Sequence, residues 1–269
     1  NKVWNASRFI MMNLEGRNVS KPDASCLEPA DQWIISALNT LVKDMTENMD
    51  KYELGIAVQK VYDFIWDEFC DWYIEIAKQR TYQYEQAPES ANAALWTLRM
   101  VLGEAMKLLH PFMPFITEEI FCTLHPQETS IMLAKWPEYK KELHFPKQAA
   151  MLARVKDVVR AVRTVRKDME VPNSRKAKLL IVSKDAQIRD QFVQAKSAYQ
   201  NLAFANEVII QPDDTGIPKD AVSAVIPDAT VYIPLEELVD RAKELERLTK
   251  EKKKLEKELE RSHHMLQNE

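Results

Sequence analysis

The chain has 269 residues, of which 46% are hydrophobic and 29% are charged, a composition typical of globular rather than disordered proteins. Its 4 glycines lie too far apart to form either of the glycine-rich turns that cradle nucleotide phosphates, so both motifs are excluded. The net charge is -4, but residues 28–75 hold 11 acidic and 3 basic side chains, whereas residues 151–178 hold 9 basic and 3 acidic ones. An acidic total therefore does not exclude a nucleic-acid partner, because binding depends on local basic surfaces.

The cysteine and histidine patterns exclude further classes. Cys26, Cys70 and Cys122 form no C-x-x-C pair, which argues against a disulfide scaffold and a sulfur-ligated zinc site and suits a reducing cytosol. None of the 5 histidines forms an i, i+4 pair, so we expect no metal site. No apolar run approaches the roughly 20 residues that a membrane-spanning helix needs, and we expect a cytoplasmic protein without a membrane partner.

Apolar residues at three- and four-residue spacing predict helices through the first half of the chain. The expected ranges are about 3–14, 29–45, 53–84, 89–109 and 115–123, with Pro29 at a favoured first position of a helix. The helix over 53–84 is apolar on so much of its circumference that several neighbours must cover it. The pattern predicts an antiparallel helix bundle over residues 1–146, with the 53–84 helix at its centre.

After residue 147 the pattern changes. A helix over 149–169 is followed by short apolar runs typical of strands at 178–182, 208–211, 221–226 and 230–233, with a helix over 187–202 between the first two. These elements predict a small α/β domain over 147–235. Leucines at heptad positions between residues 238 and 266 then predict a partial coiled-coil helix over 236–269, which needs a second strand. The expected fold class is mainly α.

Three motifs carry a resemblance to a known family: NKVWNASRF at residues 1–9, WDEFCDWYIE at 66–75 and LHPFMPFITEEI at 109–120. Together they resemble the C-terminal half of the class I aminoacyl-tRNA synthetases. The sequence VYIPL at 231–235, followed by a Lys/Glu-rich arm, most closely resembles the valyl-tRNA synthetases. An isoleucine-type enzyme, the first alternative, would be expected to end in a cysteine zinc site.

The resemblance implies an anticodon-binding helix bundle, an α/β junction domain and an arm that braces the tRNA. The parent enzyme would attach valine to tRNA with ATP and magnesium. The HIGH and KMSKS signatures of its catalytic domain are absent, so this chain should bind tRNA as a monomer, without a cofactor and without catalysing the reaction. Both ends resemble cuts through a longer protein. The second alternative is a helical protein-interaction scaffold with no role in binding DNA or RNA.

Candidate anticodon contacts lie near the start of the chain. Lys2 and Arg8 alternate with Trp4 and Phe9, and unpaired bases need cations for their phosphates and rings for stacking. The resemblance implies that Lys2 and Phe9 contact the anticodon, while Trp4 lies in the core. The alternative is that Phe9 is also core and Lys2 is solvated. The adjacent Trp72 and Tyr73 point in different directions, so we expect one in the core and the other in the anticodon groove.

A second candidate surface is the basic ridge of the 149–169 helix. Its cations lie opposite a row of valines and are continued by two more beyond the helix: Arg160, Arg163, Arg166, Lys167, Arg175 and Lys176. Such a ridge can bind a tRNA backbone without reading its sequence. A solvated helix face paired with the acidic stretch 28–75 explains the pattern equally well, and both readings stay open.

Overall fold

The computed structural model describes residues 1–238, 252, 255 and 256. The chain forms two compact units, Asn1–Ala153 and Arg154–Glu269. The predicted division at residues 146 and 235 stays a prediction. Most of the coiled coil predicted over 236–269 lies outside the described residues.

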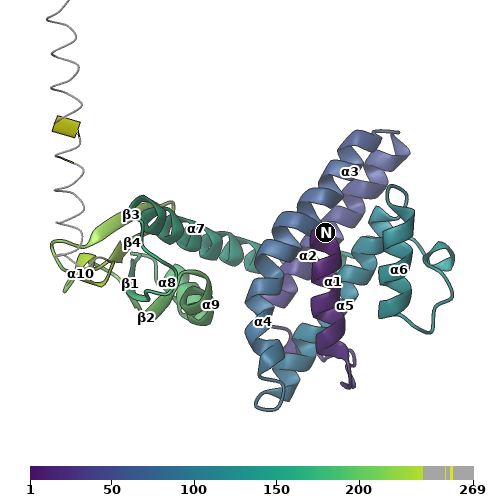
Figure 1. The fold of residues 1–269 in the computed structure, drawn as a ribbon, viewed down its shortest axis with the longest axis horizontal. Coiled ribbons are helices and arrows are strands. Elements are labelled where there is room, and N and C mark those ends of the chain that lie inside the picture. The colour runs from purple at the N-terminus through teal and green to yellow at the C-terminus, as the bar shows by residue number, and fades with distance from the viewer. Residues whose placement is uncertain (239–251, 253–254, 257–269) are drawn as a thin grey trace, which may run out of the picture. The chain divides into compact units, whose positions relative to one another are not determined.

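The first unit is a bundle of helices (Figure 1). Its members are α1 (Lys2–Leu14), α2 (Pro29–Asp50), α3 (Leu54–Asp63), the π-helical segment η2 (Phe64–Tyr73), α4 (Ile74–Tyr82), α5 (Pro88–Leu109) and α6 (Pro114–Leu124), with short 3-10 turns at η1 (Ala24–Cys26), η3 (Ile131–Leu133) and η4 (Lys141–Leu143). The five predicted helices are all present.

Local chemistry explains where these helices begin and end. Pro29, Pro88 and Pro114 each occupy the first position of a helix, where a missing N–H costs nothing and the fixed φ suits the helix. Gly16 follows α1 with a φ of 70°, a left-handed conformation that glycine adopts without strain. Since proline and glycine act locally, the sequence alone places these boundaries well.

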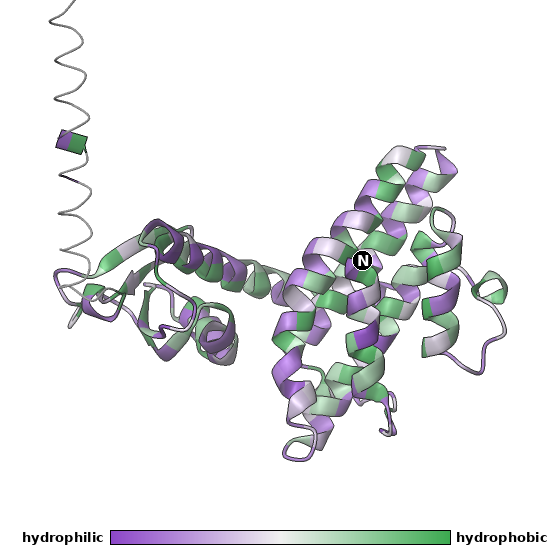
Figure 2. Cartoon of the chain, in the orientation of Figure 1, coloured by the Kyte–Doolittle hydropathy of each residue, from purple (hydrophilic) through white to green (hydrophobic). Residues whose placement is uncertain are grey.

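The centre of the bundle is α5, not the helix over 53–84 as the sequence predicted. Leu95, Leu98 and Leu102 of α5 are fully buried, and α5 packs against α1, α2, α3, α4 and α6. Figure 2 shows hydrophobic and hydrophilic residues interspersed along each of these helices, as expected for helices that bury one face. Ala91, Ala94 and other small buried residues of α5 let the neighbouring helices approach closely. The sequence prediction of the central helix relied on large apolar residues and therefore missed α5.

A buried polar network ties α2, α4 and α5 together. The Arg80 guanidinium donates to Asp31 Oδ1 at 2.7 Å and Oδ2 at 2.9 Å, and to the Ser90 carbonyl oxygen at 2.8 Å. The Tyr73 hydroxyl donates to Asp31 Oδ1 at 2.7 Å, and the Glu28 backbone N–H donates to Oδ2 at 3.0 Å. The Asp31 carboxylate is thus buried with four donors, which is what a buried charge requires.

The second unit contains a four-stranded mixed sheet in the order β2-β1-β4-β3. Its elements are α7 (Pro146–Asp168, from Arg154 onward), β1 (Ala177–Val182), α8 (Ala186–Gln194), α9 (Lys196–Leu202), β2 (Ala205–Gln211), β3 (Val222–Ile226), β4 (Ala229–Ile233) and α10 (Leu235–Leu238). Strands β1 and β2 are parallel, whereas β4 pairs antiparallel with β1 and β3.

All four predicted strands are present in this unit. The helix predicted over 187–202 is two helices that meet at Ala195, whose ψ of 9° departs from the helical value. The α/β prediction is therefore confirmed in its strands and corrected in this one helix.

Candidate nucleic-acid interface

The first candidate surface lies where α1 packs against η2. The Lys2 ammonium donates to the Trp66 carbonyl oxygen at 3.1 Å and forms an ion pair with Asp71 Oδ1 at 2.6 Å. It also lies 4.9 Å from the centroid of the Trp66 ring, which stacks at 4.9 Å on Tyr62. Lys2 is therefore neither sealed in the core nor freely solvated, but held over the Trp66 ring, which stacks on Tyr62.

Farther along α1, Phe9 is half-buried, and its ring meets that of Tyr82 edge-on at 6.4 Å. The Lys78 ammonium lies 5.7 Å from the Phe9 centroid and is paired with Glu75. Just after α1, the Arg17 guanidinium lies 4.6 Å from the ring of Tyr84. Each pair is within the distance at which a cation is attracted to an aromatic face.

We call these three pairs the cation–aromatic strip: Lys2 with Trp66, Lys78 with Phe9, and Arg17 with Tyr84. They connect α1, and Arg17 three residues beyond its end, to the continuous helix from α3 to α4 and the residues just after it. Partly exposed rings offer stacking platforms, and the adjacent cations can neutralise phosphates. The strip therefore has the two chemical components that binding of unpaired nucleotides requires.

The sequence found only one side of this strip. Lys2 and Phe9 lie on it, and their contact with the anticodon stays a prediction; Arg8 is exposed on the same helix. Trp4, predicted in the core, is exposed. The aromatic residues on the helix opposite α1 were not predicted. Their spacing could have revealed them, because Tyr62 and Trp66 are four residues apart and stack on one face of that helix.

The prediction that one of Trp72 and Tyr73 lies in the core holds, but the prediction that the other lines an anticodon groove is wrong. Trp72 is 8% exposed and Tyr73 is 0% exposed, so neither side chain lines an anticodon groove. Burial, followed by the negative charge of Asp31, raises the pKa of Tyr73 far above its ordinary value. Both rings are core because η2 is covered by α2 as well as by α1.

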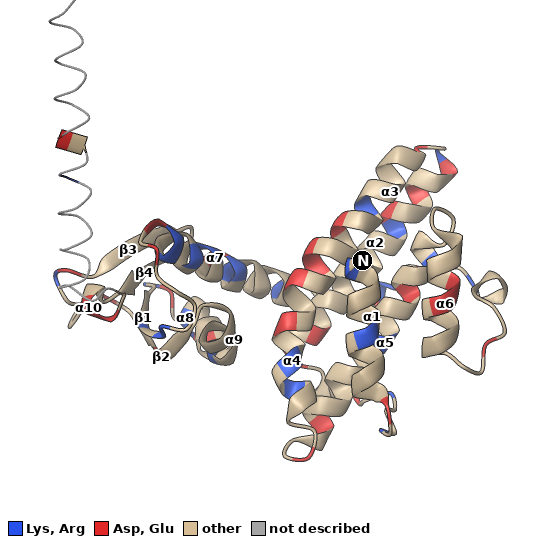
Figure 3. Cartoon of the chain, viewed as in Figure 1, with Lys and Arg blue, Asp and Glu red and all other residues tan. Residues whose placement is uncertain are grey.

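The second candidate surface is the basic face of α7, on which Figure 3 shows a run of blue segments. Arg160, Arg163 and Lys167 are exposed at helical spacing, as the sequence predicted. Arg160 lies 3.6 Å from Asp157, and Arg163 Nε donates to the Leu202 carbonyl oxygen at 3.0 Å. These three cations form a surface that a phosphate backbone can reach.

The prediction that Arg166 belongs to this exposed ridge is wrong, because its side chain is 3% exposed and cannot reach a nucleic acid. Its guanidinium donates to the carbonyl oxygens of Pro172 and Arg175 and lies 5.3 Å from the Phe204 ring. Burial lowers the pKa of this guanidinium from its ordinary value. Arg166 therefore fixes the turn between α7 and β1.

Arg175 is held as well, although it is only half-buried. Its Nε donates to the Glu237 carbonyl oxygen at 2.7 Å, and one terminal nitrogen donates to that of Glu236 at 3.3 Å. Its donors thus bind the backbone of α10, whereas the neighbouring Lys176 is exposed.

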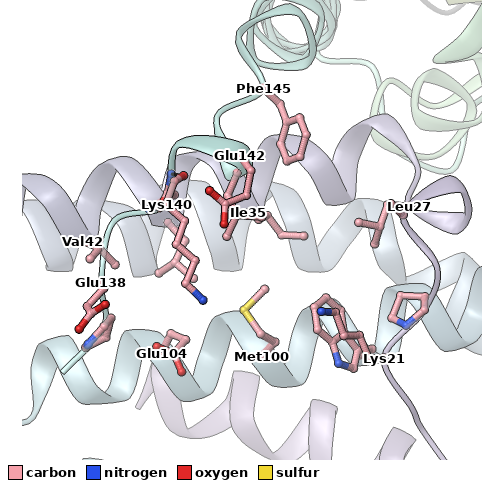
Figure 4. A pocket seen from close by; sticks show the side chains of 17 residues that line it. Lys21, Leu27, Ile35, Val42, Met100, Glu104, Glu138, Lys140, Glu142 and Phe145 are labelled. Carbon is pink, nitrogen blue, oxygen red and sulfur yellow. Dashed lines mark hydrogen bonds between the residues drawn. The ribbon is translucent and has the colours of Figure 1, made fainter. Parts of the chain in front are cut away.

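A separate cavity of about 650 Å³ lies between α2, α5 and the segments that precede α2 and α7 (Figure 4). Ile35, Val42 and Met100 contribute to its apolar wall, while Lys140 and Glu104 contribute charges. None of the residues predicted from the sequence to bind tRNA lines this cavity. Among the described residues, no group of three histidine, cysteine or acidic side chains is placed to hold a metal ion. No helix within the described part of the chain has the length and hydropathy to span a membrane.

Residues 31–181 match the family model described as the anticodon-binding domain of tRNA ligase. The chain belongs to this family. It is 44% identical to the valine–tRNA ligase of Clostridium perfringens over 270 residues, which is 100% of this chain and 30% of that protein. The corresponding protein of Clostridium tetani is 46% identical over 249 residues, 92% of this chain and 28% of that protein. That of Carboxydothermus hydrogenoformans is 38% identical over 268 residues.

This chain spans about 30% of the length of the curated relatives that it matches. The resemblance to the valyl-tRNA synthetases is confirmed over the whole chain. The family model covers α2 to α6 and continues into β1, so the cation–aromatic strip lies partly on matched helices and partly on α1, before the match.

Proposed function

We propose that this chain is the tRNA-recognition part of a valine–tRNA ligase and binds the anticodon loop of valine tRNA on the cation–aromatic strip. The parent enzyme would attach valine to tRNA with ATP and magnesium, in the cytoplasm and as a monomer. Binding energy gained at the anticodon would appear at the distant reacting end as rate and selectivity. The observation that carries the proposal is the strip itself, in a chain of the anticodon-binding family.

The arrangement assigns different roles to its members. Phe9 would stack on an unpaired base, with Tyr82 as a second wall against its edge. Lys2 and Lys78 are held by Asp71 and Glu75 in the free protein, so incoming phosphates would replace these carboxylates. The exposed cations of α7 would contact the backbone only.

The relatives are valine–tRNA ligases, and the family is one of anticodon-binding domains, so neither alternative from the sequence is favoured. An isoleucine-type enzyme has no support among these matches.

Fluorescence anisotropy of the purified chain with valine tRNA tests the proposal. Phe9→Ala should weaken binding about 10-fold, within the range of roughly 1–3 kcal/mol for base stacking on an aromatic side chain. Lys2→Ala should lower the slope of log affinity against log salt by about 1. Asp71→Asn should tighten binding by about 2- to 5-fold, because it removes a competing partner of Lys2.

Phe115→Ala is the matched control, because this exposed ring of α6 takes part in none of the three pairs of the strip. It should leave the affinity unchanged. Binding that tolerates an altered anticodon, or that Phe9→Ala and Phe115→Ala change equally, would contradict the proposal.

A further inference from the structure

The cavity between α2 and α5 is large enough to hold a small molecule. Its volume of about 650 Å³ lies within the range of roughly 300–1,000 Å³ that is typical of small-molecule sites. All the residues that line it belong to the first unit. Apolar side chains from both helices and from the segments before α2 and α7 form most of its wall: Leu27, Ile35, Val42, Trp96, Met100 and Phe145. Such a wall favours a ligand with an apolar body.

One side of the cavity is the segment 137–145, which is hydrogen-bonded along α2. The buried side-chain amide of Asn39 donates to the Lys140 carbonyl oxygen at 2.7 Å and accepts the Lys140 N–H at 2.8 Å. The Ser36 hydroxyl accepts the Phe145 N–H at 2.9 Å. These bonds fix the backbone at two points, so this side of the cavity is in place before a ligand arrives. A site that is already formed loses less affinity to ordering.

The Lys140 side chain brings a positive charge into this apolar surrounding. Figure 4 shows it extending from the 137–145 segment into the space between the two helices. Within the described part of the chain, no group forms a hydrogen bond or ion pair with its ammonium. Glu104, which lines the cavity from α5, is already paired with Lys107 at 2.7 Å. The Lys140 ammonium therefore has donors available for an anion.

The neighbouring charges restrict the ligand to a single negative charge. Glu138 and Glu142 lie two residues to either side of Lys140, are exposed and also line the cavity. A phosphate backbone or a nucleoside triphosphate would bring several negative charges close to these carboxylates, which is unfavourable. A cationic ligand would be repelled by Lys140 itself. One carboxylate or sulfonate on the Lys140 ammonium avoids both conflicts.

We propose that this cavity binds a small aromatic monoanion, with its rings against the apolar wall and its carboxylate or sulfonate on the Lys140 ammonium. Trp96 and Phe145 would contact the rings, and the flexible thioether of Met100 would adapt to their outline. The cavity shares no residue with the cation–aromatic strip. The site is therefore separate from the one proposed for tRNA.

Fluorescence titration of the intact chain with two dyes tests the proposal. Anilinonaphthalene sulfonate has an aromatic body and one negative charge, whereas phenylnaphthylamine has the same body without the charge. Lys140→Met should weaken binding of the anionic dye about 10-fold and of the neutral dye at most about 2-fold, because only the anion loses a charged hydrogen bond. Raising the salt concentration should weaken the anionic dye alone.

Lys141→Met is the matched control, because this neighbouring lysine is exposed and does not line the cavity. It removes the same charge and should change neither affinity. The proposal fails if the anionic dye does not bind, if Lys140→Met and Lys141→Met weaken it equally, or if Lys140→Met weakens both dyes equally.

Phe145→Ala gives a second measurement, directed at the apolar wall. It should weaken both dyes about 3-fold or more, because each loses apolar contact area. Phe115→Ala should weaken neither, since this exposed ring does not line the cavity. Saturating valine tRNA should leave dye binding unchanged, and displacement of the dye by tRNA would overturn the proposal by assigning the cavity to an RNA surface. Anisotropy of the Phe9 variant is read separately, so failure of the anticodon proposal is distinguishable from failure of this one.

Discussion

Replacing Arg80 by methionine tests the polar network that joins α2, α4 and α5. Methionine keeps most of the apolar stem but removes every donor of the guanidinium. The Asp31 carboxylate, 0% exposed, would lose two charged hydrogen bonds at 2.7 and 2.9 Å. It would keep the Tyr73 hydroxyl and the Glu28 N–H.

Removal of one partner of a buried ion pair costs about 3–5 kcal/mol, because the other charge stays buried. The two remaining donors, and the position of Asp31 in the first turn of α2, stabilise the carboxylate that is left. We therefore expect a loss near the lower limit, about 3 kcal/mol. Adding Asp31→Asn should recover at least about 1 kcal/mol, because the uncompensated charge is then absent.

Urea unfolding followed by tryptophan fluorescence measures this loss. All 6 tryptophans lie between residues 4 and 136, so the signal reports the first unit alone. The control is Lys43→Met, which removes an exposed pair with Glu47 at 3.9 Å and should cost at most about 0.5 kcal/mol. A loss below about 1 kcal/mol for Arg80→Met, or a double variant as unstable as the sum of the single ones, would refute this reasoning.

Three further predictions concern α5, α6 and the cysteines. A Cβ at Gly103 would lie 2.6 Å from His125 Nε2, so Gly103→Ala should be at least about 1 kcal/mol more favourable in an His125→Ala background than in wild type, measured by a double-mutant cycle in urea. Burial, then nearby cations, lowers the pKa of His125 in the folded state. As the pH drops below 6.5, the unfolded state therefore takes up a proton before the folded state does, and the free energy of unfolding should fall. Urea midpoints from pH 7.5 to 5 should show this loss, and His125→Gln should reduce it. Burial raises the pKa of Cys70 to about 11, so iodoacetamide at pH 8 should alkylate it more slowly than the half-buried Cys26; equal rates by mass spectrometry would contradict this.

Much of the helical architecture is local and could be predicted from the sequence. Proline begins α2, α5, α6 and α7, and apolar spacing predicts the stripe that each helix buries. The strands are predicted by short β-branched runs. The sequence also placed Lys2 and Phe9 on the strip, because residues seven apart share one face of a helix.

Tertiary packing decided which side chains are buried and which helix faces meet, because the periodicity of the sequence does not determine either. Trp72 and Tyr73 are both buried because α1 and α2 cover different sides of the same helix, a fact that spacing within one helix cannot contain. Arg166 has the same spacing as its exposed neighbours, yet it is buried because the turn after α7 supplies carbonyl oxygens for its donors. The partners of Phe9 come from a helix about 70 residues away. A pattern determines which residues share a face, but the arrangement of the helices determines which faces meet.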